Sequence, residues 1–271
     1  MPDPHGYKEI EGVRISGRIV GSGPPLVLLH GLGGSDAEWQ GSIPVLAQYF
    51  KVYVPTMPGH GDSGPIAEYS LESSHRLFLS FLESEGLGKV ILAGQSMGGL
   101  VALDLALNFP ERVSKLVLVD SAGLGREVNW GLRLLTLPIL GEIILDFLWP
   151  RLHTHLARLA KLAGLEVPEV MLTQGSWKFQ GSLARLLRVG IDLRGQKLWP
   201  SIRDRLPTLN VPTLIIWGEH DQLFPLSQAV DAHRTIPRSK LHVLRGGGHV
   251  VRREHVAELN EVVLKFLLSD D

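Results

Sequence analysis

A glycine-flanked serine near the middle of the chain constrains the fold more than any other feature. The apolar run Lys89-Val90-Ile91-Leu92-Ala93 has the length and character of a buried strand, and Met97 to Asn108 is a helix-forming stretch. Between them stands Gly94-Gln95-Ser96-Met97-Gly98-Gly99. A strand that turns directly into a helix strains the residue at the turn, and side chains at the flanking positions would collide there, so glycine is required. We therefore predict a sharp strand-to-helix turn with the Ser96 hydroxyl exposed at the helix N-terminus.

Strands and helices alternate along most of the chain. The predicted strands are Val13 to Val20, Pro25 to His30, Val52 to Pro55, Val90 to Gly94, Leu116 to Val119, Thr213 to Trp217 and Leu241 to Leu244. Helical spacing marks Trp39 to Tyr49, Leu71 to Glu85, Met97 to Asn108 and about Arg253 to Leu267. This order predicts an α/β fold with a doubly wound, mostly parallel sheet and functional groups at the carboxyl ends of its strands.

One long segment breaks this alternation. From about Ala122 to Arg205 no buried strand is evident, while leucines recur at helical spacing. We predict a core domain of residues 1–121 and 206–271, with residues 122–205 forming a helical cap inserted after the strand that ends at Asp120. Extra packing helices are the alternative, but the insertion begins at the strand end where a doubly wound sheet binds its ligands, which favours a cap over the site.

Composition limits the kinds of partner. With 27 Lys and Arg against 28 Asp and Glu, the chain has no charge excess to favour a nucleic acid or an anionic membrane, so a small-molecule substrate is expected. The absence of cysteine excludes disulfides and thiolate metal sites. The N-terminus lacks a signal-peptide pattern, which makes a cytoplasmic location the default expectation. The apolar stretch around Leu137 to Trp149 contains Glu142 and Asp146 and is too short to span a membrane. The sequence does not decide whether the chain forms a homodimer.

A serine nucleophile needs a base within hydrogen-bond reach and a carboxylate that orients the base. His249 follows the last predicted strand through Gly246-Gly247-Gly248, a flexible turn that lets an imidazole point inward, so it is the candidate base. Asp221 follows the strand ending at Trp217 and should emerge at the same sheet edge, which makes it the candidate carboxylate. Asp120, also at a strand end, is the rival for that role.

The negative charge that develops on an attacked carbonyl oxygen needs fixed hydrogen-bond donors, and backbone amides supply them without reorganisation. One expected donor is the N–H of Met97, behind the nucleophile. The other is the N–H of Leu32, in the glycine-rich loop from His30 to Ser35. Such a loop alone could also bind phosphate, but no Lys-Ser/Thr pair follows its glycines and no acidic ribose ligand is evident.

In combination these segments resemble the α/β-hydrolase family over essentially the whole chain. The resemblance rests on the His30-Gly31 loop, the loop from Met57 to Ser63, the Ser96 turn, and the chain order Ser96, Asp221, His249. It implies the α/β-hydrolase fold with a cap after Asp120, no metal and no organic cofactor. It also implies structural hydrogen bonding, in place of metal binding, for the side chains of the Met57 to Ser63 loop.

Serine at the turn, where haloalkane dehalogenases and epoxide hydrolases have aspartate, implies an acyl-serine intermediate. The expected function is therefore a serine hydrolase acting on a small, largely apolar carboxylic ester. The carbon–carbon bond hydrolases of aromatic degradation use the same triad and are an alternative, as are lactonases and perhydrolases. A small-molecule receptor built on the same fold is the less favoured, non-enzymatic alternative.

Substrate contacts are the least constrained part of the prediction. The candidate substrate-binding residues are Gln95, Trp149, Arg188 and Val250. Gln95 and Val250 stand where the carbon–carbon bond hydrolases commonly have Asn before the serine and Trp after the histidine, so this chain departs from that pattern. Trp149 belongs to a cap rich in Leu and Trp, which is suited to an apolar pocket, and Arg188 could serve a carboxylated substrate.

Overall fold

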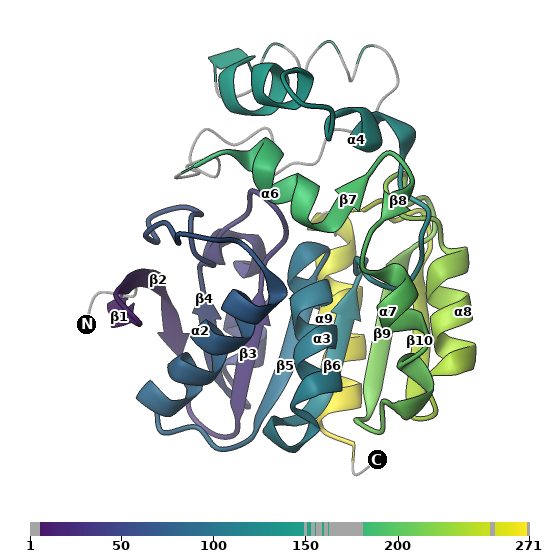
Figure 1. Ribbon diagram of the computed structural model, residues 1–271. Coiled ribbons are helices and arrows are strands. Elements are labelled where there is room, and N and C mark those ends of the chain that lie inside the picture. Colours follow the sequence, from purple (N-terminus) through teal and green to yellow (C-terminus); the bar gives the residue numbers. More distant parts are fainter. Residues whose placement is uncertain are drawn as a thin grey trace.

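The computed structural model describes residues 6–148, 151–152, 155, 159, 162, 181–249 and 253–269. Its centre is an eight-stranded sheet with the order β1-β2-β4-β3-β5-β6-β9-β10. β1 pairs with β2, and β2 with β4, in antiparallel fashion, and the remaining neighbours are parallel. The strands are β1 (Gly6–Ile10), β2 (Val13–Val20), β3 (Pro25–Leu29), β4 (Lys51–Pro55), β5 (Val90–Gln95), β6 (Val113–Val119), β9 (Thr213–Gly218) and β10 (Ser239–Leu244). The mostly parallel α/β architecture predicted from the sequence is confirmed (Figure 1).

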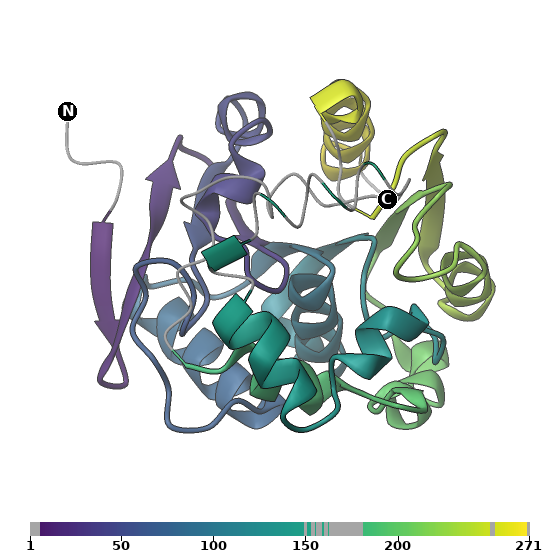
Figure 2. The ribbon, with the colours of Figure 1, turned by 90° about the horizontal axis from the view of Figure 1, so that it is seen from above.

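Helices cover both faces of this sheet, as the view from above shows (Figure 2). Their bounds are η1 (Asp36–Trp39), α1 (Ile43–Leu46), α2 (Leu71–Ser84), α3 (Met97–Asn108), η2 (Pro110–Arg112), α8 (Ser227–Thr235) and α9 (Arg253–Leu267). The central strands are buried on both faces, so their side chains enter two separate cores. Leu116 and Leu118 pack with α2, α3 and α8, whereas Val117 and Val119 pack with α1 and α9.

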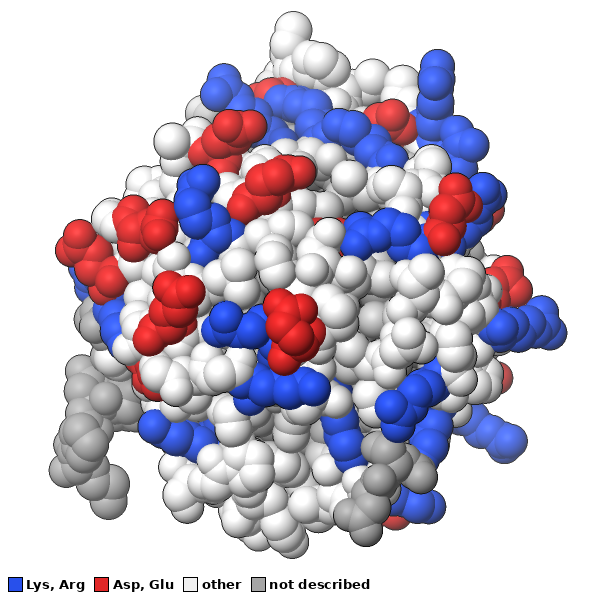
Figure 3. Space-filling model, turned by 60° about the horizontal axis from the view of Figure 1, so that its bottom comes forward, with Lys and Arg blue, Asp and Glu red and all other residues white. Residues whose placement is uncertain are grey.

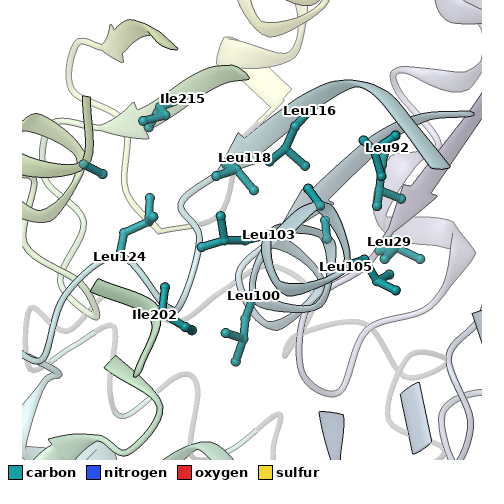
Figure 4. Close-up of a cluster of buried hydrophobic side chains, with 14 of the residues drawn as sticks. Leu29, Leu92, Leu100, Leu103, Leu105, Leu116, Leu118, Leu124, Ile202 and Ile215 are labelled. Atoms are coloured by element: carbon teal, nitrogen blue, oxygen red, sulfur yellow. The ribbon is translucent and has the colours of Figure 1, made fainter. Parts of the chain in front are cut away.

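The core around α3 is the larger of the two, and part of it is drawn in Figure 4. Leu103 and Leu105 of α3 are fully buried there against Leu92, Leu116 and Leu118 of the sheet. Burying a leucine side chain stabilises the fold by roughly 1.5–3 kcal/mol. This packing fixes the position of α3 relative to the end of β5, and therefore the position of Ser96 between them.

The segment between β6 and the returning strand β9 holds the elements for which a cap was predicted. They are α4 (Trp130–Leu134), a π-helix η3 (Glu142–Leu148), α6 (Leu183–Gly190), β7 (Ile191–Asp192), β8 (Gly195–Gln196) and α7 (Trp199–Arg203). The short helix η5 (Leu206–Thr208) follows in the part predicted as core. In Figure 1, α4 and α6 lie above the ends of the central strands. The expectation of no strand in this segment is wrong in one detail, because β7 and β8 form a short antiparallel pair.

Two further predictions differ from the structure. The N-terminal strand β1 was not predicted; its sequence GYKEI carries no apolar run, and it forms by pairing with β2 at the sheet edge. The helix expected from Trp39 to Tyr49 divides into η1 and the one-turn α1. Gly41 disfavours the helix and Pro44 lacks the N–H that a continuous helix would use, so Pro44 sits in the first turn of a new one.

The surface is mixed in charge. Lys and Arg side chains lie among Asp and Glu over the face seen in Figure 3. Within the described part of the chain, no helix has both the length and the apolar character that a bilayer crossing requires.

Candidate active site

Ser96 lies at the sharp turn between β5 and α3. Its φ of 52° and ψ of −115° are a conformation that L-residues rarely adopt. The glycines make this turn possible: a Cβ on Gly94 would lie 2.3 Å from the Gly98 carbonyl oxygen, and one on Gly98 would lie 2.5 Å from the carbonyl oxygens of Leu29 and His30. The Ser96 N–H donates to the Val119 carbonyl (3.0 Å), and its own carbonyl accepts from the Ala122 N–H (3.0 Å).

The three predicted triad residues form one hydrogen-bonded chain. His249 Nε2 lies 2.9 Å from Ser96 Oγ, and His249 Nδ1 lies 2.8 Å from Asp221 Oδ2. Because an ionised carboxylate only accepts, the geometry assigns the proton to Nδ1, which leaves the Nε2 lone pair free to accept from the serine hydroxyl. The other carboxylate oxygen, Asp221 Oδ1, accepts from the N–H groups of Leu223 (2.7 Å) and Phe224 (3.0 Å).

The histidine and its carboxylate are shielded from water. Their side chains are 9% and 0% exposed, and the Phe224 ring meets the imidazole edge-on with centroids 5.1 Å apart. Exclusion of water strengthens the interaction between an imidazolium and the carboxylate. The arrangement therefore holds the imidazole ring in one orientation beside the carboxylate, shielded from water.

Asp120, the rival carboxylate, takes another role in the structure. It is fully buried at the end of β6, and its Oδ1 accepts from the Gly218 N–H at 2.7 Å. Burial, together with the nearby charge of Asp221, raises the pKa of Asp120 well above its ordinary value. The carboxyl thus ties the end of β6 to the end of β9, while Asp221 is the group that contacts His249.

The two residues predicted to supply amide donors lie at the same cavity as the serine. Leu32 and Met97 both line it together with Ser96. Met97 is the first residue of α3, so its N–H belongs to the helix turn that has no intrahelical acceptor. In the loop that carries Leu32, the Gly31 carbonyl accepts from the Gly34 N–H at 3.1 Å.

A pair of buried histidines supports this loop. His30 Nε2 accepts from the Met57 N–H (2.8 Å) and Nδ1 lies 2.7 Å from the Gly31 carbonyl oxygen, so the ring is held neutral. Burial, with the neighbouring His60, lowers the pKa of His30 to about 3, and burial lowers the pKa of His60 to about 4. The two rings meet edge-on, 5.0 Å apart. The two neutral imidazole rings therefore pack together beneath the loop and hold it in place.

The cavity beside Ser96 has a volume of about 280 Å³ and a predominantly apolar wall. Core helix α2 contributes Leu77, Phe78 and Phe81. Elements between β6 and β9 contribute Leu132, Leu135, Leu145, Leu183 and Leu187. Among the residues that the structure describes, no Lys or Arg lines the cavity, and Glu38 is its one carboxyl group.

The remaining predicted substrate contacts divide into three groups. Gln95 lines the cavity and its Nε2 donates to the backbone carbonyl of His249 at 3.0 Å, so it holds the backbone of the predicted base. Arg188 of α6 forms an ion pair with Glu142 of η3, which lowers the pKa of Glu142 to about 2, and it is not part of the cavity wall. Trp149 and Val250 lie outside the described residues.

Sequence reasoning missed Glu38. The carboxyl oxygens lie 3.2 and 3.3 Å from the Gly31 N–H, and burial raises the pKa of Glu38 to about 7. A glutamate in Ser35-Asp36-Ala37-Glu38 is ordinary at a helix start, so nothing in the sequence separates it from a solvated residue.

Comparisons with known proteins place these features in context. Residues 26–262 match the model of the alpha/beta hydrolase family. An uncharacterized protein of Mycobacterium bovis is 31% identical, with 96% of this chain and 80% of that protein covered. A pimeloyl-[acyl-carrier protein] methyl ester esterase of Vibrio campbellii is 32% identical over 84% of this chain and 89% of its own. A meta-cleavage product hydrolase of Pseudomonas fluorescens, solved as a mutant in complex with acetates, superposes with a TM-score of 0.70 at 27% identity, covering 97% of both chains.

Proposed function

The chain belongs to the alpha/beta hydrolase family, and on that footing we propose that it hydrolyses small, largely apolar carboxylic esters through an acyl-serine intermediate. The observation that carries the proposal is the chain of contacts from Ser96 through His249 to Asp221 at the wall of an apolar cavity. Nucleophile, base and orienting carboxylate lie at hydrogen-bond distances, which is the arrangement that acyl transfer requires.

The proposed reaction proceeds in two halves. His249 Nε2 takes the hydroxyl proton as Ser96 Oγ attacks the ester carbonyl carbon, and the N–H groups of Leu32 and Met97 donate to the oxyanion. The carbon–oxygen bond to the alcohol then breaks, and the imidazolium returns its proton to the leaving oxygen. Water, deprotonated by the same nitrogen, attacks the acyl carbon. The carbon–oxygen bond to Ser96 then breaks, the imidazolium returns its proton to Ser96 Oγ, and the acid is released. Asp221 holds the imidazole orientation and stabilises its positive charge throughout.

The cavity wall supports the choice of an apolar substrate. Leucines and phenylalanines from α2 and from the segment between β6 and β9 supply most of its surface, and they favour an alkyl or aryl group over a charged one. A carboxylated substrate would need a cation, and the cation predicted from the sequence, Arg188, pairs with Glu142 and is not part of the cavity wall. Esterase activity in a relative at 32% identity is consistent with this choice.

A second candidate is hydrolysis of a carbon–carbon bond. It is favoured by one observation, the likeness to a meta-cleavage product hydrolase over nearly the whole of both chains. The same triad would serve, with a carbon in place of the alcohol oxygen as the leaving atom.

A substrate panel run on the purified protein tests both candidates. We would compare p-nitrophenyl esters of increasing acyl length, lactones, and ring-fission diketones with and without a carboxylate. Steady turnover of the uncharged esters is expected, falling by a factor on the order of 10⁶ in Ser96→Ala. Ser84→Ala, at an exposed serine near the end of α2, is the matched control and should leave turnover unchanged.

The outcomes separate the readings. Faster turnover of the carboxylated diketones than of any ester would transfer the assignment to carbon–carbon bond hydrolysis. A single turnover without steady release would indicate a small-molecule receptor. Ester turnover that survives in Ser96→Ala would refute the acyl-serine route altogether.

A further inference from the structure

Glu38 is an acidic side chain in the wall of an otherwise apolar cavity, and the reaction outlined above does not use it. It belongs to η1, one helical turn after the loop that carries Leu32. Its carboxyl group folds back beneath that loop and fills the space beside Gly34, where a Cβ would come within 2.3 Å of Glu38 Oε2. Any side chain at position 34 would therefore collide with the Glu38 carboxyl group.

The carboxyl completes a set of contacts around a single residue of the loop, Gly31. Glu38 accepts from the Gly31 N–H, with its oxygens at 3.2 and 3.3 Å. On the other side, the Gly31 carbonyl oxygen accepts from His30 Nδ1 (2.7 Å) and from the Gly34 N–H (3.1 Å). Both polar groups of Gly31 are thus engaged.

These contacts determine where the next amide points. The Gly31 carbonyl and the Leu32 N–H belong to the same planar peptide group and point in opposite directions. Fixing the carbonyl toward His30 therefore directs the Leu32 N–H away from that ring, and Leu32 itself lines the cavity that holds Ser96. Glycine has no side chain to limit rotation at residue 31, so the contact from Glu38 supplies a restraint that the residue itself lacks.

Burial favours the protonated form of Glu38, whereas the contact from the Gly31 N–H favours its carboxylate form. Of the described ionisable side chains, those of His60, Tyr69 and His249 line the same cavity as Glu38, and His30 lies in the loop beside it. His30 and His60 are neutral because burial lowers the pKa of each. Arg18 pairs with the neighbouring acid, Asp36. Among the described residues, no Lys or Arg forms an ion pair with Glu38.

We propose that Glu38 is a positioning residue of the oxyanion hole, and that it acts as the neutral carboxylic acid. Its carbonyl oxygen accepts from the Gly31 N–H and, together with the contacts of His30 and Gly34 to the Gly31 carbonyl, fixes the Leu32 N–H. Ionisation would place a negative charge within the same wall as the developing oxyanion and oppose it. The inference rests on the proposed function and adds a proton requirement to it.

The test compares kcat and KM across pH 5–9 for the wild type, Glu38→Gln and Glu38→Ala. Glutamine keeps the accepting oxygen and has no proton to lose. We expect Glu38→Gln to hold kcat within about threefold at neutral pH and to lose the decline in kcat that the wild type shows as pH rises above neutral. Glu38→Ala should lower kcat by about tenfold or more with little change in KM, because the oxyanion contact is made only in the transition state. Glu111→Gln, at an exposed acid, is the matched control.

Each contrary outcome overturns the inference. Equal losses in the Gln and Ala variants would show that the carboxyl itself, not its accepting oxygen, is needed. An alkaline decline that persists in Glu38→Gln would assign that ionisation to another group, and unchanged kcat in Glu38→Ala would remove the positioning role. If Glu38→Ala does not fold, the Gln profile still decides. If turnover is lost in Ser96→Ala while the Glu38 variants give one of these contrary results, only the role of Glu38 is refuted and the proposed function stands.

Discussion

The strained backbone at Ser96 leads to a prediction that concerns stability alone. Glycine adopts a φ of 52° with ψ of −115° far more readily than any residue with a Cβ. Ser96→Ala and Ser96→Gly both remove the hydroxyl and its contact with His249, so the two variants differ only in the Cβ. Comparing them with each other isolates the strain from the loss of the hydrogen bond.

The size of the effect follows from opposing contributions. A residue with a side chain in such a sparsely populated region costs about 1–3 kcal/mol, and the ψ value here lies outside the left-handed helical region as well, which favours the upper end. Against this, glycine adds about 0.4–1 kcal/mol of conformational entropy to the unfolded chain. The lost methyl group is only half-buried and contributes less than the ~0.8 kcal/mol of a buried CH₂. We expect Ser96→Gly to be more stable than Ser96→Ala by about 1 kcal/mol.

Thermal and urea unfolding of the two Ser96 variants measure this difference. For a domain of this size, 1 kcal/mol corresponds to a rise in Tm of roughly 2–4 °C. Gly88→Ala serves as a control for the general effect of the exchange, since a Cβ there would meet nothing within 4 Å and no positive φ is recorded. Equal stability of the two Ser96 variants, or a more stable alanine variant, would refute the claim that the turn stores strain.

Three further outcomes are expected. Asp221→Asn should lower kcat by about 10⁴-fold while Asp120→Asn leaves most of the turnover, because only Asp221 contacts His249; the opposite order in the folded variants would exchange their roles. Since burial raises the pKa of Glu38 from 4.5 to about 7, the folded state binds this proton more tightly than the unfolded state, and stability falls as pH rises between those values. Glu38→Gln should remove up to about 3 kcal/mol of that loss, seen as a smaller difference in unfolding free energy between pH 5 and pH 8; parallel pH profiles for both proteins would contradict it. Leu103→Ala should destabilise the fold by about 2–5 kcal/mol in urea unfolding, because the side chain is fully buried; a loss below 1 kcal/mol would show that the core around it closes up.

Local sequence patterns were sufficient for the parts of the fold that depend on local chemistry. The helix from Met97 to Asn108 and the glycines around Ser96 were predicted at their observed positions, because the turn tolerates no other residue there. Asp221 and His249 were named from their places after strands, and parallel strands bring such positions to one edge of the sheet.

Features that depend on contacts between distant segments were not predictable in the same way. Edge strand β1 has no apolar pattern of its own and exists through its pairing with β2. Arg188 is drawn to Glu142, 46 residues away in the chain. The pKa of Glu38 is raised by burial in the wall of a cavity that several elements build. The raised pKa is therefore a property of the assembled fold and not of the residues next to Glu38 in the sequence.

The backbone contacts of Ser96 define where the molecule can be re-engineered. The Ser96 peptide groups bond to Val119 and to Ala122, so the first residues beyond β6 are part of the framework that holds Ser96 in place. If the segment between β6 and β9 is exchanged for the corresponding segment of another hydrolase, the new segment should therefore be joined after Ala122 and not at the end of β6. Joined there, the exchanged segment can bring a new cavity wall while the serine keeps its original backbone partners.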